Sequence, residues 1–297
     1  MGTKTIFIVS LPRSGSTLLR SLIITDESIK GLSEAWLLLP LLTFDQPEKY
    51  ISTYGSAAVN KAMSEYEDLG GSVKDLKREI AKTAVTQIAK GLKTNIIVDK
   101  TPRYYQALSE LKSLEDEFNT LIILRRPILE VIASYEKTFS NIFFKVPLFK
   151  NEFIDGPIAM SKEFSSSTII VDYEELITDT KAVVNRINKK LNINCDIDKA
   201  SIGKNTGVFG DPKFGEKSSI EAIKLRYIDW TSYYYYRFRI KPKLSGEVDK
   251  EFLSERNIQI KFSFKSLLNL LFLPIASFIR IINLKASLSI FNKKYFG

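Results

Sequence analysis

A short loop rich in small hydroxyl side chains follows the first apolar run of the chain. The run Ile6-Phe7-Ile8-Val9 is typical of a buried β-strand, and the loop Leu11–Thr17 comes directly after it. A strand, a tight loop and a helix in this order present backbone N–H groups to an oxyanion, and the helix N-terminus adds a partial positive charge. A guanidinium, hydroxyl groups and a glycine suit this loop to anion binding: Arg13, Ser14, Gly15, Ser16 and Thr17. The loop therefore predicts a site for phosphate or a chemically similar group.

The loop differs from the one that holds nucleoside triphosphates, whose pattern is G-x-x-x-x-G-K-[ST]. The first glycine of that pattern is absent, and Ser16 stands where the lysine belongs. The cation of this loop is Arg13, which precedes the turn. The run Ile96–Asp99 nevertheless resembles a strand whose terminal aspartate binds magnesium, so a kinase that uses ATP and Mg²⁺ remains an alternative.

The chain contains no histidine, which is the commonest general base in enzymes. A base for a transfer reaction must then be a carboxylate or, less readily, a lysine or a tyrosine. Glu34 follows the second apolar run and precedes Trp36-Leu37-Leu38, which can exclude water from the carboxyl group. Burial raises the pKa of a carboxyl group toward the range that suits proton transfer. Glu34 is therefore the candidate base.

Five apolar runs, rich in β-branched residues, must position these side chains. They are Thr5–Val9, Ile29–Leu32, Asn95–Val98, Leu121–Leu124 and Thr168–Val171. Helical stretches separate the runs, which predicts an α/β fold with a parallel five-stranded sheet buried on both faces. The loop, Glu34, Lys100 and the pair Arg125-Arg126 each follow one of these strands. Because open α/β sheets bind ligands at the carboxyl ends of their strands, we expect these residues to converge at one edge.

The segment Val73–Gly91 is predicted to be a helix that Ser72 caps. Its apolar residues recur at helical spacing, which predicts that they form the buried face: Val73, Leu76, Ile80, Ala84 and Ile88. We expect this helix, within the segment Leu37–Thr94, and the segment Phe139–Ser167 to cover the side of the sheet where an acceptor binds.

The segment Leu11–Leu19 resembles the 5′-phosphosulfate loop of the sulfotransferases that use 3′-phosphoadenosine 5′-phosphosulfate (PAPS). It is closer to the carbohydrate and tyrosylprotein branch, P-R-S-G-[ST]-[ST]-L, than to the cytosolic small-molecule branch, which has lysine at the place of Arg13. The resemblance runs from the first strand to about Lys213. It implies a P-loop-like three-layer fold, PAPS as the sulfuryl donor and no requirement for a metal. It also implies that Ser14–Thr17 hold the 5′-phosphosulfate and that Arg13 faces the bridging oxygen.

The resemblance also implies a second anion site, for the 3′-phosphate of PAPS. The family builds it from an arginine at a strand end and a serine eight residues later. Arg126 and Ser134 have that spacing. Arg125 instead matches the family's Arg-x-Pro pattern, so both arginines stay candidates, with Arg126 favoured.

Two further roles follow from the same resemblance. Asp99-Lys100-Thr101-Pro102 is similar to the family's K-[TD]-P element, in which the lysine stabilises charge on the transferred group. A glutamate at the place of Glu34 is the catalytic base of the carbohydrate and tyrosylprotein enzymes. The expected reaction is sulfuryl transfer to a hydroxyl group of a glycan or glycolipid, with Glu34, Lys100 and Arg13 as catalytic residues.

The positive charge of the chain is concentrated at its C-terminal end. Residues 256–297 hold seven of the 43 Lys and Arg residues and none of the 34 Asp and Glu residues. The first 255 residues therefore carry 36 basic and 34 acidic groups, a balance that does not indicate nucleic-acid binding. These counts predict a sulfotransferase domain over residues 1–255 and a basic, apolar tail over residues 256–297. The tail suits either an anionic membrane surface or packing on the domain.

A single cysteine, Cys195, and the lack of a recognisable signal peptide lead us to expect a cytoplasmic protein, which the tail would allow to bind peripherally to a membrane. The tail also leaves open a protein of another class, a membrane-associated nucleotide-binding protein without catalytic activity. That alternative does not explain why Arg13, Glu34 and Lys100 occur together.

Overall fold

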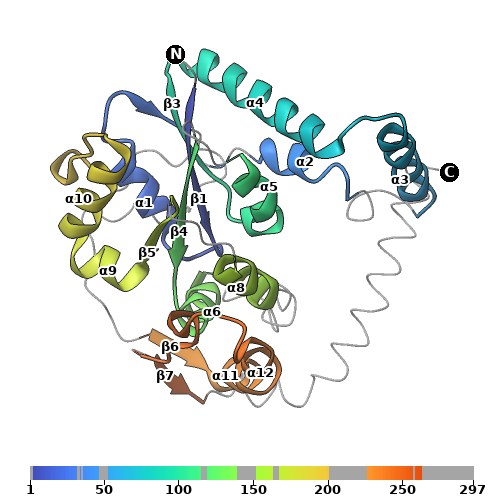
Figure 1. Cartoon of the computed structure of the whole chain (residues 1–297). Helices are drawn as coiled ribbons and strands as arrows, with labels where there is room; N and C mark the ends of the chain where they lie inside the picture. The colour runs from blue at the N-terminus through green and yellow to red at the C-terminus, as the bar shows by residue number, and fades with distance from the viewer. Residues whose placement is uncertain are drawn as a thin grey trace.

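A five-stranded parallel sheet forms the centre of the molecule (Figure 1). The computed structural model describes residues 3–31, 34, 36–46, 53–114, 119–138, 152–162, 167–200, 226–256 and 258–262. The strand order is β2-β3-β1-β4-β5, and the strands are β1 Lys4–Ser10, β2 Ile29–Lys30, β3 Ile96–Lys100, β4 Asn119–Arg125 and β5 Ile169–Asp172. All pairs within this sheet are parallel. The predicted α/β fold and its five strands are confirmed, with β2 shorter than expected.

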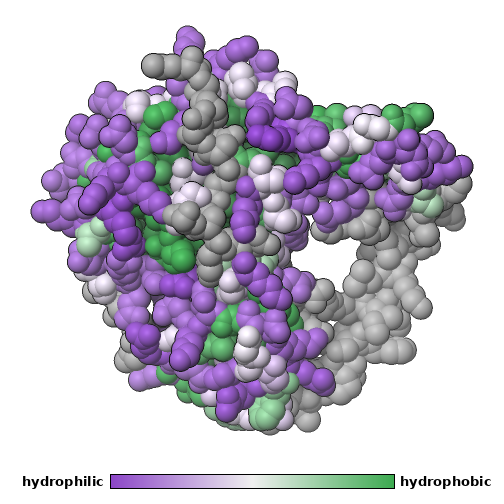
Figure 2. Space-filling view, in the orientation of Figure 1, coloured by the Kyte–Doolittle hydropathy of each residue, from purple (hydrophilic) through white to green (hydrophobic). Residues whose placement is uncertain are grey.

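Helices cover both faces of the sheet because the strands are apolar on both sides. Phe7 and Val9 of β1 pack into the core under one layer of helices: α2 Leu38–Leu42, α4 Val73–Leu92, α5 Leu108–Ser113, α6 Ile128–Thr138 and α8 Glu152–Lys162. Ile6 and Ile8 face the opposite core, under α1 Ser16–Ile23, α9 Tyr173–Thr178 and α10 Thr180–Leu191. Short 3₁₀ helices, η2 Tyr104–Ala107 and η3 Ile197–Lys199, follow β3 and α10. Hydrophilic side chains cover most of the described surface in the view of Figure 2.

The helix predicted over Val73–Gly91 is α4, and the Ser72 side chain accepts a hydrogen bond from Asp75 N–H as its cap. The predicted buried face is confirmed at Val73 and in part at Ala84 and Ile88, which pack against the core, but it was wrong at Leu76. The most buried positions are Val73, Lys77, Ala81, Val85 and Ala89, whereas Leu76 is 40% exposed. Lys77 lies on the buried face because its ammonium group is 2.7 Å from Asp45 and 3.2 Å from Glu110, while its methylene groups pack inside.

A second, smaller unit, which we call the C-terminal unit, follows the main sheet in the sequence and packs against α6. It consists of β6 Arg226–Asp229, α11 Trp230–Tyr235, the π-helix η5 Tyr236–Ile240, α12 Lys241–Leu244, the 3₁₀ helix η6 Lys250–Leu253 and β7 Ile258–Lys261. β6 and β7 pair in parallel, so this ribbon contains residues from both sides of the predicted boundary at residue 255. The helix α3 Thr53–Asp68 lies away from the sheet, at the right of Figure 1.

Most of the predicted tail, residues 263–297, lies outside the described residues. The same holds for residues 139–151 and 163–166 of the segment predicted to cover the acceptor side. Within the part of the chain that the structure describes, none of the helices has the length and apolar character needed to span a membrane.

Candidate active site

The loop after β1 is a tight turn that leads directly into α1. Arg13 and Gly15 both have positive φ, 67° and 93°, and α1 begins at Ser16. A Cβ atom on Gly15 would lie 2.6 Å from the ring of Tyr173, so only glycine fits there. Ser14 and Ser16 are buried, and the first turn of α1 contains no acidic residue that would oppose a bound anion.

Glu34 and Lys100, predicted from separate segments, form an ion pair with 2.6 Å between Lys100 Nζ and Glu34 Oε1. The Lys100 side chain is 1% exposed and that of Glu34 is 15% exposed. The other carboxylate oxygen of Glu34 accepts a hydrogen bond of 3.1 Å from the indole N–H of Trp36. Trp36 itself has a positive φ of 52°, and its backbone N–H donates to Thr101 Oγ1. A non-glycine residue held in this backbone conformation is strained, which is a feature of functional sites.

Arg126 and Ser134, the predicted 3′-phosphate pair, both contact the loop after β1. Arg126 Nη1 donates to the carbonyl oxygen of Arg13 over 2.6 Å, and Arg13 Nε lies 3.4 Å from Ser134 Oγ. Arg126 is 3% exposed, and its guanidinium carbon lies 3.9 Å from the centre of the Tyr173 ring. Burial lowers the pKa of Arg126 to about 10, so the guanidinium is still positively charged at neutral pH. Its Nη2 atom is buried without a hydrogen-bond partner among the described residues.

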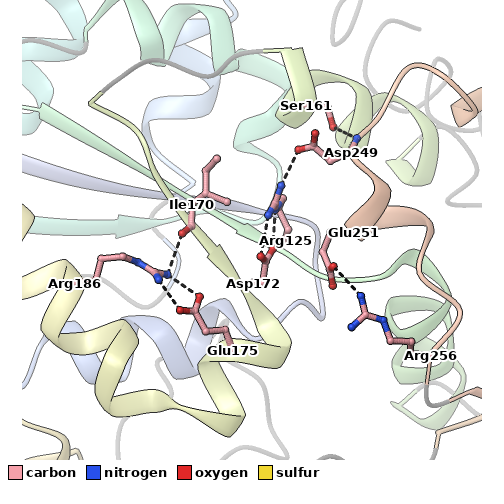
Figure 3. A network of polar contacts seen from close by, with 9 residues as sticks. All are labelled: Arg125, Ser161, Ile170, Asp172, Glu175, Arg186, Asp249, Glu251 and Arg256. Carbon is pink, nitrogen blue, oxygen red and sulfur yellow. Dashed lines mark hydrogen bonds and ion pairs between the residues drawn. The ribbon is translucent and has the colours of Figure 1, made fainter.

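Arg125 has different surroundings (Figure 3). Its guanidinium bonds both oxygens of Asp172, at 2.7 and 2.8 Å, and one oxygen of Asp249, at 2.8 Å. The backbone N–H of Asp249 donates in turn to Ser161, so Arg125 connects β4, β5, α8 and the C-terminal unit. These contacts hold Arg125 between structural elements, and the contacts found for it among the described residues do not include the loop after β1.

Three residues at the site were not predicted from the sequence: Glu130, Tyr173 and Arg226. Glu130 Oε2 is 3.2 Å from Arg126 Nε and 3.1 Å from Arg226 Nε. Arg226 also lies 3.4 Å from the hydroxyl of Tyr173. Tyr173 belongs to the motif Tyr173-Glu174-Glu175-Leu176, which could have pointed to it, but Arg226 has no local sequence signal. Together they surround Arg126 with a carboxylate, an aromatic ring and a second guanidinium group.

Asp99 lies beneath the site at the end of β3. It is 4% exposed and accepts a hydrogen bond of 2.7 Å from the hydroxyl of Tyr104. Burial raises the pKa of Asp99 to about 6, although Tyr104, Thr101 and the charges of Lys100 and Arg20 act in the opposite direction. The hydrogen bond to Tyr104 therefore fixes Asp99 in the interior next to Lys100, and its carboxyl group does not reach the surface.

The register of the sheet arranges these groups around the loop. β1 lies between β3 and β4, with Ile8 opposite Lys100 and Ser10 opposite Leu124. The loop after β1 therefore has the Glu34–Lys100 pair on one side and Arg126 with Ser134 on the other. The Arg126 Nη2 atom, which has no hydrogen-bond partner among the described residues, and the glycine turn beside Tyr173 suit the binding of anionic groups. Among the described residues, no three acidic or cysteine side chains are grouped so that they could hold a metal ion.

A family model described as the sulfotransferase family matches residues 5–196. This is close to two thirds of the chain, and the chain belongs to the sulfotransferase family. The match includes the loop, Glu34, Lys100, Arg126 and Ser134.

Individual proteins are also similar to this chain. The nodulation protein NoeE of Sinorhizobium fredii is 31% identical over 137 residues, which are 46% of this chain and 32% of that protein. The matched part is thus about a third of that relative. A sulfotransferase domain from the curacin biosynthetic pathway has a TM-score of 0.49 and 20% identity, over 74% of this chain and 88% of the other. A sulfotransferase domain from the Synechococcus PCC 7002 olefin synthase has a TM-score of 0.47 and 19% identity, over 74% and 85%.

Proposed function

We propose that this protein transfers a sulfuryl group from PAPS to a hydroxyl group of a glycan or glycolipid. The observation that carries the proposal is the strand order β3-β1-β4. In this order the loop after β1 lies between the Glu34–Lys100 ion pair and the buried Arg126, which supports the binding of a donor with two anionic groups. Membership of the sulfotransferase family supports the chemistry, and the sequence of the loop supports the carbohydrate branch.

The donor would be held at two places. The loop amides with Ser14, Ser16 and Thr17 suit the 5′-phosphosulfate, and Arg126 with Ser134 suits the 3′-phosphate. The contact between Arg126 and the Arg13 carbonyl favours Arg126 over Arg125, whose donors are taken by Asp172 and Asp249.

Glu34 is the base of the proposed reaction. It takes the proton of the acceptor hydroxyl while the acceptor oxygen bonds to sulfur and the bond from sulfur to the 5′-phosphate oxygen breaks. The electron pair of the broken bond stays on that phosphate oxygen. Arg13, Lys100 and the loop amides stabilise the charge that develops there and on the sulfuryl oxygens. Such a reaction depends on positioning and charge, as phosphoryl transfer does.

The kinase alternative receives no support from the family match. It needs a lysine in the loop that reaches the phosphates, and Ser16 stands at that position. The alternative of a binding protein without catalytic activity gives no reason for an ion pair between Glu34 and Lys100 beside the loop.

Thermal unfolding with 3′,5′-adenosine bisphosphate, the product of the donor, tests the proposal. We expect stabilisation in the presence of EDTA, by about 2.7 kcal/mol at a ligand concentration near a hundred times the dissociation constant. Adenosine lacking both phosphates is the control and should have little effect. Stabilisation by ATP with Mg²⁺ but not by the bisphosphate would overturn the proposal in favour of a kinase.

A further inference from the structure

Three side chains lie next to the Glu34–Lys100 pair and have no part in the reaction above: Trp36, Arg103 and Glu152. We call them the outer cluster. Trp36 bonds Glu34, and the Arg103 guanidinium carbon lies 5.8 Å from the centre of the Trp36 ring. Arg103 Nε lies 3.4 Å from Glu152 Oε1. The outer cluster therefore extends from the predicted base toward the first turn of α8.

Glu152 is a buried carboxyl group, and among the described residues its side chain has one weak partner, Arg103. Its side chain is 5% exposed, and its Oε2 atom has no hydrogen-bond partner among the described residues. Burial raises its pKa, and the charge and hydrogen bond of Arg103 act against that rise. A buried carboxylate oxygen without a donor is destabilising, and a ligand hydroxyl at this place would supply the missing donor.

Two tyrosines pack on α8 near Glu152: the Tyr135 ring centre lies 5.7 Å from that of Phe153, and a Cβ atom on Gly156 would lie 3.4 Å from Tyr105. Burial, followed by the negative charge of Glu152, raises the pKa of both Tyr105 and Tyr135. The positive charges of Arg103 and Arg13 act against this rise in the pKa of Tyr135. A Cβ atom on Gly156 would lie 2.5 Å from Leu11, which shows how closely α8 packs on the start of the loop.

The chemistry of the outer cluster matches a sugar. The Oε2 atom of Glu152 can accept from one hydroxyl, and Arg103, whose side chain is 42% exposed, can donate to its neighbour. The half-buried indole of Trp36 offers an apolar surface for the C–H face of a ring. An anionic sugar fits less well, because Glu152 already neutralises Arg103 and would repel a second carboxylate.

We propose that Trp36, Arg103 and Glu152 form the acceptor subsite and bind vicinal hydroxyl groups of a neutral sugar. This inference rests on the proposed function, since it assigns the acceptor of the reaction for which Glu34 is the base. It selects uncharged sugars over uronic acids.

Binding of disaccharides to the protein saturated with 3′,5′-adenosine bisphosphate tests the subsite. Saturation-transfer NMR with lactose, cellobiose and N,N′-diacetylchitobiose should detect at least one neutral ligand, and a glucuronic-acid disaccharide should bind more weakly. Glu152→Gln keeps the shape but removes the charge, so its affinity for the neutral ligand should fall about tenfold. The preference for the neutral over the uronic disaccharide should fall by a similar factor. Arg103→Gln, at a position whose side chain is 42% exposed, should lower neutral-sugar binding as well.

Glu110→Gln is the matched control, because Glu110 is also a poorly exposed carboxylate in an ion pair, with Lys77, outside the site. It should bind sugars and bisphosphate as the wild type does. Absence of neutral-sugar binding in the wild type, or unchanged sugar affinity in both Glu152→Gln and Arg103→Gln, would overturn the subsite. Bisphosphate binding is measured first and without sugar, so a failure of the proposed donor is seen separately.

Discussion

Glu34 combines two properties at the scale of a single residue. It is the predicted base of the reaction, and it is also the counter-ion of Lys100, which is 1% exposed. Glu34→Gln removes both properties. We expect turnover to fall by about 10²–10⁴, because a positioned base contributes that factor, while bisphosphate affinity changes little. Radiolabelled PAPS with a glycan acceptor measures turnover.

A loss of activity through unfolding must be separated from a loss of the base. Glu34→Gln alone should lower the free energy of unfolding by about 3 kcal/mol, since it breaks a buried ion pair. Glu34→Gln with Lys100→Met removes both charges and should recover much of that stability without recovering turnover. Turnover above about a third of the wild-type value, with chemistry rate-limiting, would show that another residue takes the proton.

The two neighbouring arginines give opposite expectations. Arg126→Ala should weaken the binding of 3′,5′-adenosine bisphosphate by about 1.5–3 kcal/mol more than the binding of adenosine 5′-phosphate, because only the first ligand has the 3′-phosphate. Arg125→Ala should lower the melting temperature, since three bonds to Asp172 and Asp249 are lost, and leave that difference between ligands unchanged. Calorimetric titration of both ligands measures the difference. Equal weakening of both ligands by Arg126→Ala would place the 3′-phosphate elsewhere.

At the scale of elements, the sequence predicted what depends on local pattern. Apolar runs located all five strands, and the residues after them located the loop, Glu34 and Lys100. Side-chain direction at a strand end is not a local property, so the sequence could not assign different roles to Arg125 and Arg126. The position of Asp249 beside Arg125 distinguishes the two. Arg226 lies more than two hundred residues beyond the loop, and only the packing of β6 on α6 brings it to Glu130.

The error in α4 has a similar cause. Hydrophobicity predicted Leu76 on the buried face, whereas the structure exposes Leu76 and buries Lys77. The acidic partners of Lys77, Asp45 and Glu110, come from separate segments and permit its burial. Long-range ion pairs of this kind leave no periodic signal in the sequence.

The end of β3 gives a prediction about pH. Burial raises the pKa of Asp99 to about 6, above the value near 4 expected in the unfolded chain. The folded protein therefore binds more protons than the unfolded chain between these values, and the contribution of Asp99 to stability falls as the pH rises through this window. Above about pH 7 the loss is complete and amounts to about 3 kcal/mol.

Asp99→Asn removes this titration and retains a group that accepts from Tyr104. The unfolding free energy of the variant, relative to the wild type, should rise by up to about 3 kcal/mol from pH 4 to pH 7 and then stay constant. Urea denaturation across this range measures it. Tyr104→Phe should move the window to higher pH, since the hydrogen bond from Tyr104 lowers the pKa of Asp99. A difference between Asp99→Asn and wild type that does not depend on pH would contradict the assignment.

At the scale of the whole molecule, charge and apolar surface are unevenly distributed. The segment 230–246, which contains α11, η5 and α12, has four Lys and Arg residues and no acidic residue. Several large apolar side chains of the C-terminal unit are exposed, with Phe238 at 59% and Phe262 at 65%. The chain continues from Phe262 into residues 263–297, which add five basic and no acidic residues. Exposed aromatic and basic groups in one region favour contact with an anionic lipid surface.

The chain without residues 263–297 tests whether the tail carries such a contact. We expect the full chain to sediment with vesicles that contain phosphatidylglycerol and the truncated chain to remain in the supernatant. The reason is that each of the five cations contributes about 1 kcal/mol to the free energy of binding to an anionic surface. The cut belongs after Phe262, since β7 pairs with β6 and an earlier cut would remove a strand. Bisphosphate should stabilise both chains equally.

Replacing the five cations with glutamine in the full chain separates charge from apolar contact, and phosphatidylcholine vesicles control for non-specific sedimentation. Unfolding of the truncated chain would show that the tail packs on the domain, and unchanged sedimentation would place lipid binding elsewhere or in the aromatic surface around Phe238.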